Sequence, residues 1–240
     1  MTHALKPDAS IVVLTGAGMS AESGVPTFRG VDGLWEGHRI EDVASPEGFA
    51  RDPELVHRFY NLRRAALNNV QPNAGHHALA KLEREWRGRF LLITQNVDDL
   101  HERAGSEKLI HMHGELRKVR CEGCGAVFSW SQDLASGTRC RACGEIGGMR
   151  PHIVWFGEFP FEMDAILAAL KRADLFLCIG TSGVVYPAAG FAQIAAERSS
   201  CHLIEMNIEA TAISRQFDEH IIGPVAVELP KLVERLLTTG

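Results

Sequence analysis

Four of the six cysteines in this 240-residue sequence form two pairs whose spacing suits a metal ion. Cys121 and Cys124 are separated by two residues, fifteen residues follow, and Cys140 and Cys143 repeat the same spacing. Two thiolates on one tight turn can face one side of a metal ion, and two such pairs complete tetrahedral zinc. Four sulfurs leave no vacant position for water, so this zinc would be structural rather than catalytic. Two disulfides or four unrelated thiols are the alternative interpretation.

A glycine-marked turn follows the first apolar run of the chain. Residues 11–14 are Ile-Val-Val-Leu, which suits a buried strand that stops at Thr15. Gly16 and Gly18 then permit the close backbone approach that a pyrophosphate resting on backbone amides requires. An ordinary dinucleotide fingerprint also needs a second strand with a terminal acidic residue, and residues 30–52 contain no strand-like run. We therefore expect a nucleotide site covered by a long loop over residues 24–37.

Polar side chains follow two further strand-like runs. Residues 90–94 precede Gln95, Asn96 and Asp98, and residues 109–112 precede His113. Open α/β sheets bind ligands at the carboxyl ends of parallel strands, so these side chains are candidate site residues. An imidazole titrates near neutrality and suits a general base, although a histidine at a strand end is more often structural. Asn96 and Asp98 would serve equally well as caps of a helix beginning near residue 98.

The remaining segments alternate between helical and strand-like patterns. We expect helices over residues 53–70, 73–86, 161–172, 187–198 and 229–237, and strands or extended segments over 152–156, 175–179 and 202–206. Asn73 is the predicted N-cap of the second helix. In the first helix, Leu55, Phe59, Leu62 and Ala66 form one apolar stripe. Alternation of strands and helices predicts an α/β fold whose parallel sheet is covered by helices on both faces.

Composition excludes several classes of partner. A net charge of -5 provides no general attraction to nucleic acid or to an anionic membrane, and no apolar run reaches 18 residues. The N-terminal ten residues are too short and polar for a signal sequence, which predicts a cytoplasmic protein. Residues 115–150 carry a slight basic excess, so nucleic-acid binding through the cysteine-rich insert is a minor alternative.

Six blocks of sequence together resemble the sirtuins, which are NAD-dependent lysine deacylases. The blocks are Gly-Ala-Gly-Met-Ser-Ala-Glu-Ser-Gly-Val-Pro-Thr-Phe-Arg from residue 16, Thr-Gln-Asn-Val-Asp from 94, His-Met-His-Gly-Glu from 111, the four-cysteine motif, Ile-Val-Trp-Phe-Gly-Glu from 153 and Gly-Thr-Ser from 180. Their common order over residues 11–230 makes chance agreement improbable. The resemblance implies a Rossmann-like NAD-binding domain built from residues 1–30, 73–114 and 151–240. It also implies a small domain, residues 31–72 and 115–150, that holds a helical segment and the four-cysteine zinc ribbon.

The resemblance further implies the reaction and its participants. In sirtuins the acyl oxygen of a modified lysine attacks the anomeric carbon of the nicotinamide ribose, so NAD is consumed and O-acyl-ADP-ribose is released. His113 maps to the general base, and Asn96 and Asp98 map to residues that orient ribose and nicotinamide. The implied cofactor-binding residues are Gly16, Ala17, Gly18, Ala21, Glu22, Thr27, Phe28, Arg29, Trp35, Gln95, Asn96, Asp98, Gly180, Thr181, Ser182, Asn207 and Val225.

The implied partners are acylated lysine side chains of proteins. Ile153, Val154 and Trp155 match the segment that clamps an extended substrate peptide by backbone pairing. Without the resemblance, these three residues would be interpreted as a core strand. Many sirtuins carry a phenylalanine at the position of Trp155, so the resemblance does not predict the shape of the lysine tunnel here.

The acyl group is suggested by a tyrosine and an arginine three residues apart. Tyr60 and Arg63 lie off the apolar stripe of their helix and match the Tyr-x-x-Arg signature of class III sirtuins, and Ala21 replaces a bulkier residue. A hydroxyl and a guanidinium suit a succinyl or malonyl carboxylate, and some deacetylation is expected as well. Spacing alone would allow Arg64 in place of Arg63. A protein ADP-ribosyltransferase and a non-catalytic NAD-binding or zinc-ribbon module are the alternative functions.

Overall fold

The computed structural model describes residues 5–27 and 37–239. Within these residues, six strands form one parallel sheet in the order β3-β2-β1-β7-β8-β9. They are β1 (Ile11–Thr15), β2 (Phe90–Thr94), β3 (Leu109–His111), β7 (Leu175–Ile179), β8 (His202–Asn207) and β9 (Glu219–Ile222). Because β1 lies between β2 and β7, loops leave the centre of the sheet in both directions and open a crevice there. The predicted α/β class with a parallel sheet is confirmed.

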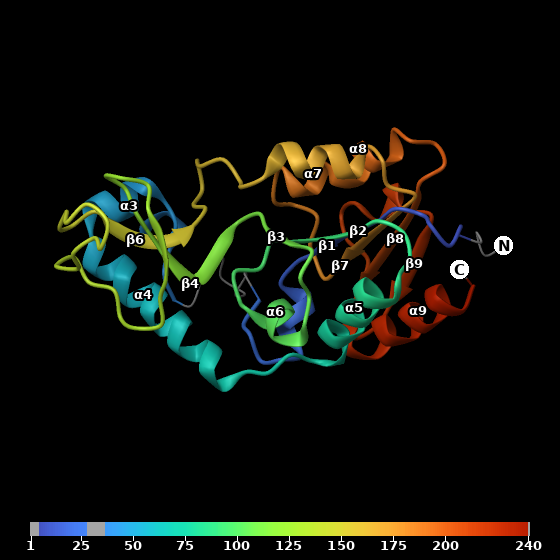
Figure 1. Ribbon diagram of the computed structural model, residues 1–240, viewed down its shortest axis with the longest axis horizontal. Helices are drawn as coiled ribbons and strands as arrows, with labels where there is room; N and C mark the ends of the chain where they lie inside the picture. The colour runs from blue at the N-terminus through green and yellow to red at the C-terminus, as the bar shows by residue number, and fades with distance from the viewer. Residues whose placement is uncertain (1–4, 28–36, 240) are drawn as a thin grey trace.

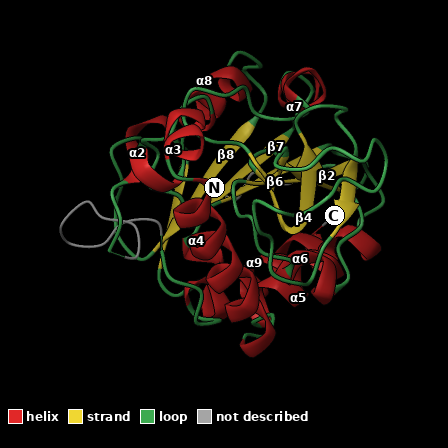
Figure 2. Ribbon diagram, turned by 90° about the vertical axis from the view of Figure 1, so that its left-hand side faces the viewer, coloured by secondary structure: helices red, strands yellow, loops and turns green. Residues whose placement is uncertain are grey.

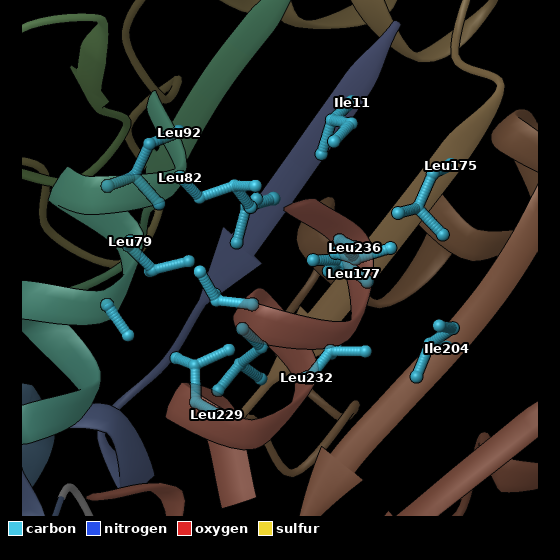
Figure 3. Packing of buried hydrophobic residues seen from close by; sticks show 14 of the residues in the cluster. Ile11, Leu79, Leu82, Leu92, Leu175, Leu177, Ile204, Leu229, Leu232 and Leu236 are labelled. Carbon is cyan, nitrogen blue, oxygen red and sulfur yellow. The ribbon is translucent and has the colours of Figure 1, made fainter. Parts of the chain in front are cut away.

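Helices cover both faces of the sheet, as Figure 1 shows. Ile11 and Val13 face the helices α5 (Ala74–Glu85) and α9 (Val225–Thr239), whereas Val12 and Leu14 face α7 (Met163–Leu170) and α8 (Phe191–Ala196). This division follows from the two-residue period of a strand, which turns successive side chains to opposite faces. In Figure 3, leucines of α5 and α9 converge on the sheet residues of the first face.

The element boundaries agree with the predictions where the local signals were strong. Asn73 caps α5 as predicted, since its side chain accepts from the backbone of Gly75 and His76 and the His76 ring accepts from the Asn73 backbone. By contrast, α9 begins at Val225 rather than near residue 229, and the strand or extended segment expected over residues 152–156 is a strand at Met149–Ile153. Strand β9 was not predicted, because it is a short edge strand that alternates half-buried and exposed residues and carries little hydrophobic pattern.

A second, antiparallel sheet belongs to a small module beside the parallel sheet. Its strands, in the order β5-β4-β6, are β4 (Gly114–Cys121), β5 (Val127–Ser129) and β6 (Met149–Ile153). Helices α2 (Ile40–Val43), α3 (Pro46–Arg51) and α4 (Pro53–Ala66) pack against it, and Figure 2 views this part of the molecule from its outer side. Short helices α2 and α3 were not predicted. The inserted small unit with a helical segment is thus confirmed, and its domain boundaries stay a prediction.

The apolar stripe predicted for α4 is wrong at Leu62 and Ala66, which are exposed, and it omitted Tyr60, which is buried. Leu62 is 71% exposed, whereas Tyr60 is fully buried with Val56 and Phe59. The reason is tertiary, because α4 is covered by α3 on one side and by the chain after β6 on another, where Trp155 contributes its ring. The buried face of α4 is therefore rotated toward Tyr60 and away from Leu62.

Candidate functional site

Two glycine turns meet at the carboxyl edge of the parallel sheet. The Gly16 amide donates to the carbonyl of Ile179 at 2.9 Å, and the Gly18 amide donates to that of Gly180 at 2.8 Å. A Cβ on Gly18 would lie 2.7 Å from the Gly180 Cα, and Gly180 itself has a φ of +62°. The turn after β1 therefore packs directly on the turn after β7, which only residues without side chains allow. These glycines, and Ala17 between them, shape the backbone floor of the crevice.

Amide and hydroxyl side chains cross the same edge from strand to strand. The Gln95 amide after β2 donates to the Thr181 hydroxyl after β7 at 3.1 Å, and the Asn207 amide at the end of β8 donates to the Thr181 carbonyl at 2.9 Å. Beside them, Ser182 is exposed. The structure thus brings together predicted site residues from three strands. Amides and hydroxyls are the donor and acceptor set that ribose hydroxyls need, so the edge fits the NAD that the sequence predicts.

Asn96 and Asp98 are buried around a serine that the sequence analysis did not single out. The Ser20 hydroxyl, in α1 (Gly18–Ala21), donates to the Asp98 carboxylate at 2.9 Å and accepts from the Asn96 amide at 3.1 Å. The other Asp98 oxygen accepts from the Leu100 amide at the start of α6 (Leu100–Ala104), although the N-cap position itself is Asp99. Burial is the largest effect on Asp98 and raises the pKa of its carboxyl above the ordinary value.

Two further buried histidines complete this polar cluster. His76 lies 3.4 Å from the Ser20 hydroxyl, and His101 lies 3.1 Å from the hydroxyl of Thr15 at the end of β1. Burial lowers the pKa of His76 to about 4 and lowers that of His101 as well, so both rings are neutral near pH 7. No sequence pattern could have found Ser20, His76 or His101, because a buried polar residue on a helix has no periodic signature.

His113 lies in the turn between β3 and β4, where its ring contacts the backbone of Gln95. Its Nδ1 is 3.2 Å from the Gln95 carbonyl, which can only accept, so Nδ1 carries the proton and the basic electron pair is on Nε2. Burial lowers the pKa of His113 below its ordinary value, partly opposed by this hydrogen bond. The ring is therefore neutral and basic at Nε2 near pH 7, the state that a general base requires.

His111 differs from His113 although it is only two residues away. Its Nδ1 lies 3.1 Å from the Asn96 carbonyl, and its Nε2 lies 2.8 Å from the carboxylate of Glu102. Burial alone would lower the pKa of His111, but hydrogen bonding and charge from Glu102 outweigh it and raise the pKa above the ordinary value. With both ring nitrogens engaged, His111 supports the backbone of Asn96 instead of offering a free base.

Other predicted cofactor residues lie around the crevice or outside the described chain. The Glu22 carboxylate accepts from the Ala226 amide at 2.7 Å, so it caps α9, whose first residue is the buried Val225. Ala21 and Thr27 are exposed. Phe28, Arg29 and Trp35 lie outside the described residues.

The predicted peptide segment is joined directly to His113. The Val154 amide donates to the His113 carbonyl at 2.9 Å, while Ile153 pairs with Gly114 at the end of β6. The side chains of Ile153 and Trp155 are buried in the module, as a core strand would be, and Val154 is half-buried. The backbone that would clamp a peptide is therefore held next to the candidate base.

Tyr60 and Trp155 form one buried wall of the module. The Trp155 indole donates to the Tyr60 hydroxyl at 2.9 Å, and the Arg150 guanidinium lies 3.2 Å from the centroid of the Trp155 ring. Glu158 holds this arrangement, because it accepts from the Trp155 amide at 2.8 Å and from Arg150. Burial raises the pKa of Tyr60 to about 12, and the charge of the nearby Arg63 opposes the rise. The phenol is therefore protonated at every physiological pH.

The two candidate arginines of α4 have different surroundings. Arg64 is buried and donates to the Leu116 carbonyl at 2.7 Å and to the Asn61 amide oxygen at 2.8 Å, so it stabilises the junction of α4 with β4. Arg63 is half-buried and its guanidinium carbon lies 5.6 Å from the centroid of the Phe59 ring. Arg64 therefore has a structural role, whereas Arg63 is the arginine of this pair whose charge acts on Tyr60.

The four predicted metal ligands gather at one end of the module. All four sulfurs lie within 4.8 Å of one another, with 3.8 Å between Cys121 and Cys143 and 3.7 Å between Cys124 and Cys140. Tetrahedral zinc with Zn–S bonds of about 2.3 Å requires sulfurs about 3.8 Å apart, whereas a disulfide requires about 2.05 Å. The Gly125 and Gly144 amides each donate to the carbonyl of the first cysteine of their pair, so the two turns match. The cluster fits structural zinc, and the disulfide alternative is wrong.

Fold and site together define a nucleotide-binding parallel sheet joined to a zinc-ribbon module. A family model described as "Sir2 family" matches residues 16–187. An NAD-dependent protein deacylase of Bdellovibrio bacteriovorus is 57% identical over 95% of this chain and 97% of its own. A Sir2 homologue solved with NAD has a TM-score of 0.87 and 42% identity, covering 97% of this chain and 91% of its own. A Sir2 protein solved with an acetylated peptide has a TM-score of 0.80 and 30% identity, covering 94% and 92%.

The chain belongs to the Sir2 family, the sirtuins. The family, the fold, the NAD dependence and the deacylase class predicted from the sequence are confirmed. The relative from Bdellovibrio is bacterial, and in the described part of the chain no helix is both long and apolar enough to cross a membrane. The cytoplasmic location and the individual roles of the site residues stay predictions.

Proposed function

We propose that this NAD-dependent protein deacylase removes succinyl and malonyl groups, as well as acetyl groups, from lysine side chains of proteins. The products would be the free lysine, nicotinamide and O-acyl-ADP-ribose. The observation that carries the acyl preference is the pairing of Tyr60 with Arg63 beside Trp155. A protonated phenol and a guanidinium together offer donors of the kind that a terminal carboxylate accepts.

The choice of Arg63 is supported by the surroundings of its neighbour. Arg64 already donates to Leu116 and Asn61 inside the module, and turning it toward a substrate would leave those acceptors unsatisfied. Arg63 shares a helix face with Tyr60 at a spacing of three residues. An acidic acyl group placed there would gain a charge-assisted hydrogen bond, whereas an acetyl group would not.

The proposed catalytic base is His113, acting through Nε2. NAD supplies the reaction with an anomeric carbon from which nicotinamide can leave. Gln95 holds the His113 ring through Nδ1, and a proton relayed from a ribose hydroxyl would be accepted at Nε2. Asn96 and Asp98, oriented by Ser20, would position ribose and nicotinamide. The glycine turns, with Thr181, Ser182 and Asn207, would hold the phosphates and the adenosine ribose.

The proposed partner is an extended peptide carrying the acyl-lysine. Peptide recognition by backbone pairing along residues 153–155 would tolerate many sequences, because main-chain hydrogen bonds carry the affinity. Nucleic acid is not a proposed partner, since the chain has a net charge of -5.

Mass spectrometry of the reaction products tests this proposal. The purified protein is incubated with NAD and matched succinylated, malonylated and acetylated peptides, and the peptides and nucleotides are identified. We expect deacylated peptide with one O-acyl-ADP-ribose for each acyl group removed. A peptide or protein that gains ADP-ribose while it keeps its acyl group would show an ADP-ribosyltransferase instead. NAD binding without any product would show a non-catalytic module.

Replacement of Arg63 by methionine tests the acyl preference. The loss of charge-assisted hydrogen bonds worth about 2 kcal/mol should lower kcat/KM for succinyl and malonyl peptides by about thirtyfold. Deacetylation should change by less than about threefold, because acetyl lacks the carboxylate. Arg58→Met is the matched control, since Arg58 is an exposed arginine of the same helix. An equal fall for all three acyl groups would contradict the role of Arg63.

A further inference from the structure

A cavity opens at the amino ends of the parallel strands, opposite the edge where we expect NAD to bind. Its volume is about 620 Å³, and it is lined by the first residues of β1 and β2, by the loop before β2 and by the end of α7. This is the edge at which the N-terminal segment enters β1 in Figure 1. Each central strand spans five residues, or about 16 Å, so the cavity is separated from the crevice by the length of the sheet.

The rim of this cavity is strongly basic. Arg87, Arg89, Lys108 and Arg172 line it, against a single carboxylate from Asp8. The concentration of positive charge runs against the net charge of -5 of the whole chain. Exposed cations from three separate segments therefore border one open hollow, where their combined positive charge favours anions.

The four rim cations have no partner among the side chains of the described residues. In residues 5–27 and 37–239, none of their side chains takes part in a hydrogen bond or an ion pair. Neighbouring cations do find acidic partners, such as Arg84 with Glu85 at 2.8 Å and Arg198 with Asp174 at 2.6 Å. Unsatisfied cations that surround a cavity retain their full capacity to bind an anion.

Helix termini explain only part of this arrangement. Arg87 and Arg172 follow the carboxyl ends of α5 and α7, where a positive charge complements the helix dipole. Arg89 and Lys108 instead immediately precede β2 and β3, where no helix ends. Helix dipoles therefore explain two of the four positive charges at this edge and leave those of Arg89 and Lys108 unexplained.

The floor of the cavity is apolar and includes Val12, Leu91 and Ala169. Ligand cavities commonly measure about 300–1,000 Å³ and combine such a floor with a few polar groups at the rim. Guanidinium groups match phosphate oxygens through paired N–H donors. Nucleic acid would instead need a basic stripe along the surface rather than cations around one cavity. We propose that this cavity binds a small polyanion that carries two or more phosphate groups.

Calorimetric titration with ATP and with inorganic tripolyphosphate tests the proposal. Binding in the NAD crevice is distinguished from binding in this cavity by the rim variants described below, which leave the crevice unchanged. We expect both probes to bind, with affinity falling several-fold as ionic strength rises. Binding of ATP alone would also support the cavity and would show that the apolar floor is required.

Paired variants locate the binding. Arg89→Gln/Lys108→Gln should weaken binding of the probes by about tenfold, because it removes two of the four rim cations. Arg58→Gln/Lys231→Gln removes the same charge from exposed positions elsewhere and should change binding by less than about twofold. The proposal is overturned if neither probe binds at millimolar concentration, or if the rim variant binds as well as the control. Tighter binding of a DNA duplex or an acidic peptide than of tripolyphosphate would also overturn it.

Discussion

The indole N–H of Trp155 donates a hydrogen bond to the hydroxyl of Tyr60 at 2.9 Å, in the interior of the small module. This contact joins two segments whose functions were predicted independently, the peptide-binding segment that includes Trp155 and the helix α4, which is predicted to select the acyl group. Tyr60→Phe should lower the free energy of unfolding by about 1–3 kcal/mol, because the buried indole loses its acceptor. Trp155→Phe should also destabilise the protein, through the lost hydrogen bond and the smaller ring.

Chemical denaturation of the two single variants and the double variant measures the coupling between these side chains. Removing both hydrogen-bonding groups should cost less than the sum of the single losses, since no buried donor is then left unpaired. Strictly additive losses would show that the contact contributes no stability.

The midpoint of the acid limb of the pH profile for kcat/KM should lie below pH 6.5, which is the ordinary pKa of a histidine. His113 acts only when neutral, and burial lowers its pKa, so the neutral form persists to more acidic pH than for an exposed histidine. His113→Ala should reduce turnover by about a hundredfold or more while NAD binding, measured by calorimetry, changes little. A wild-type limb above pH 6.5, or an active alanine variant, would contradict the assignment of the base.

Gly180→Ala should destabilise the protein by about 2 kcal/mol or more and weaken NAD binding. Its φ of +62° disfavours a side chain, and a Cβ would lie 2.5 Å from the Met19 backbone nitrogen, so the two glycine turns must separate. Gly137→Ala is the control, because nothing lies within 4 Å of its Cβ position, and it should change stability by less than about 0.5 kcal/mol. Thermal melts with and without NAD compare the two variants.

Arg64→Met should behave as a stability variant and not as a specificity variant. It leaves the Leu116 carbonyl and the Asn61 amide oxygen without their donor inside the module, at a cost of about 2–4 kcal/mol. The ratio of desuccinylation to deacetylation at a temperature where the variant is folded should match that of the wild type. A changed ratio would move the acyl-selecting role from Arg63 to Arg64.

Removal of zinc should unfold the ribbon before the parallel sheet. Metal analysis of the purified protein should give one zinc per chain, and a chelator should then speed amide hydrogen exchange at Val119, a buried residue of β4 between the cysteines and the sheet junction. Val13, in the centre of β1, should stay protected. Unchanged protection of Val119 after complete loss of zinc would contradict a structural metal.

Local signals in the sequence were sufficient for much of the architecture. The apolar runs of β1, β2 and β7, the Asn73 cap and the two cysteine pairs are encoded within a few residues each, and all of them appear as predicted. Strands β5 and β9 were missed because edge strands bury only part of their side chains, and the central strand β4 was missed because its residues 114–121 mix charged and apolar side chains. Neither hydrophobic alternation nor a turn motif marks them.

The sequence by itself determined the family, the zinc ligands and the position of the glycine turns, because each depends on residue types at fixed spacing. Tertiary structure alone decided that Tyr60 is buried and Leu62 exposed, since the buried face of α4 is set by the elements that cover it. It also gave Arg64 structural hydrogen bonds that distinguish it from Arg63. It placed Ser20 in contact with both Asn96 and Asp98, and it put a carbonyl acceptor beside Nδ1 of His113, so that this nitrogen carries the proton. These relationships join residues far apart in the chain, and only packing brings such residues together.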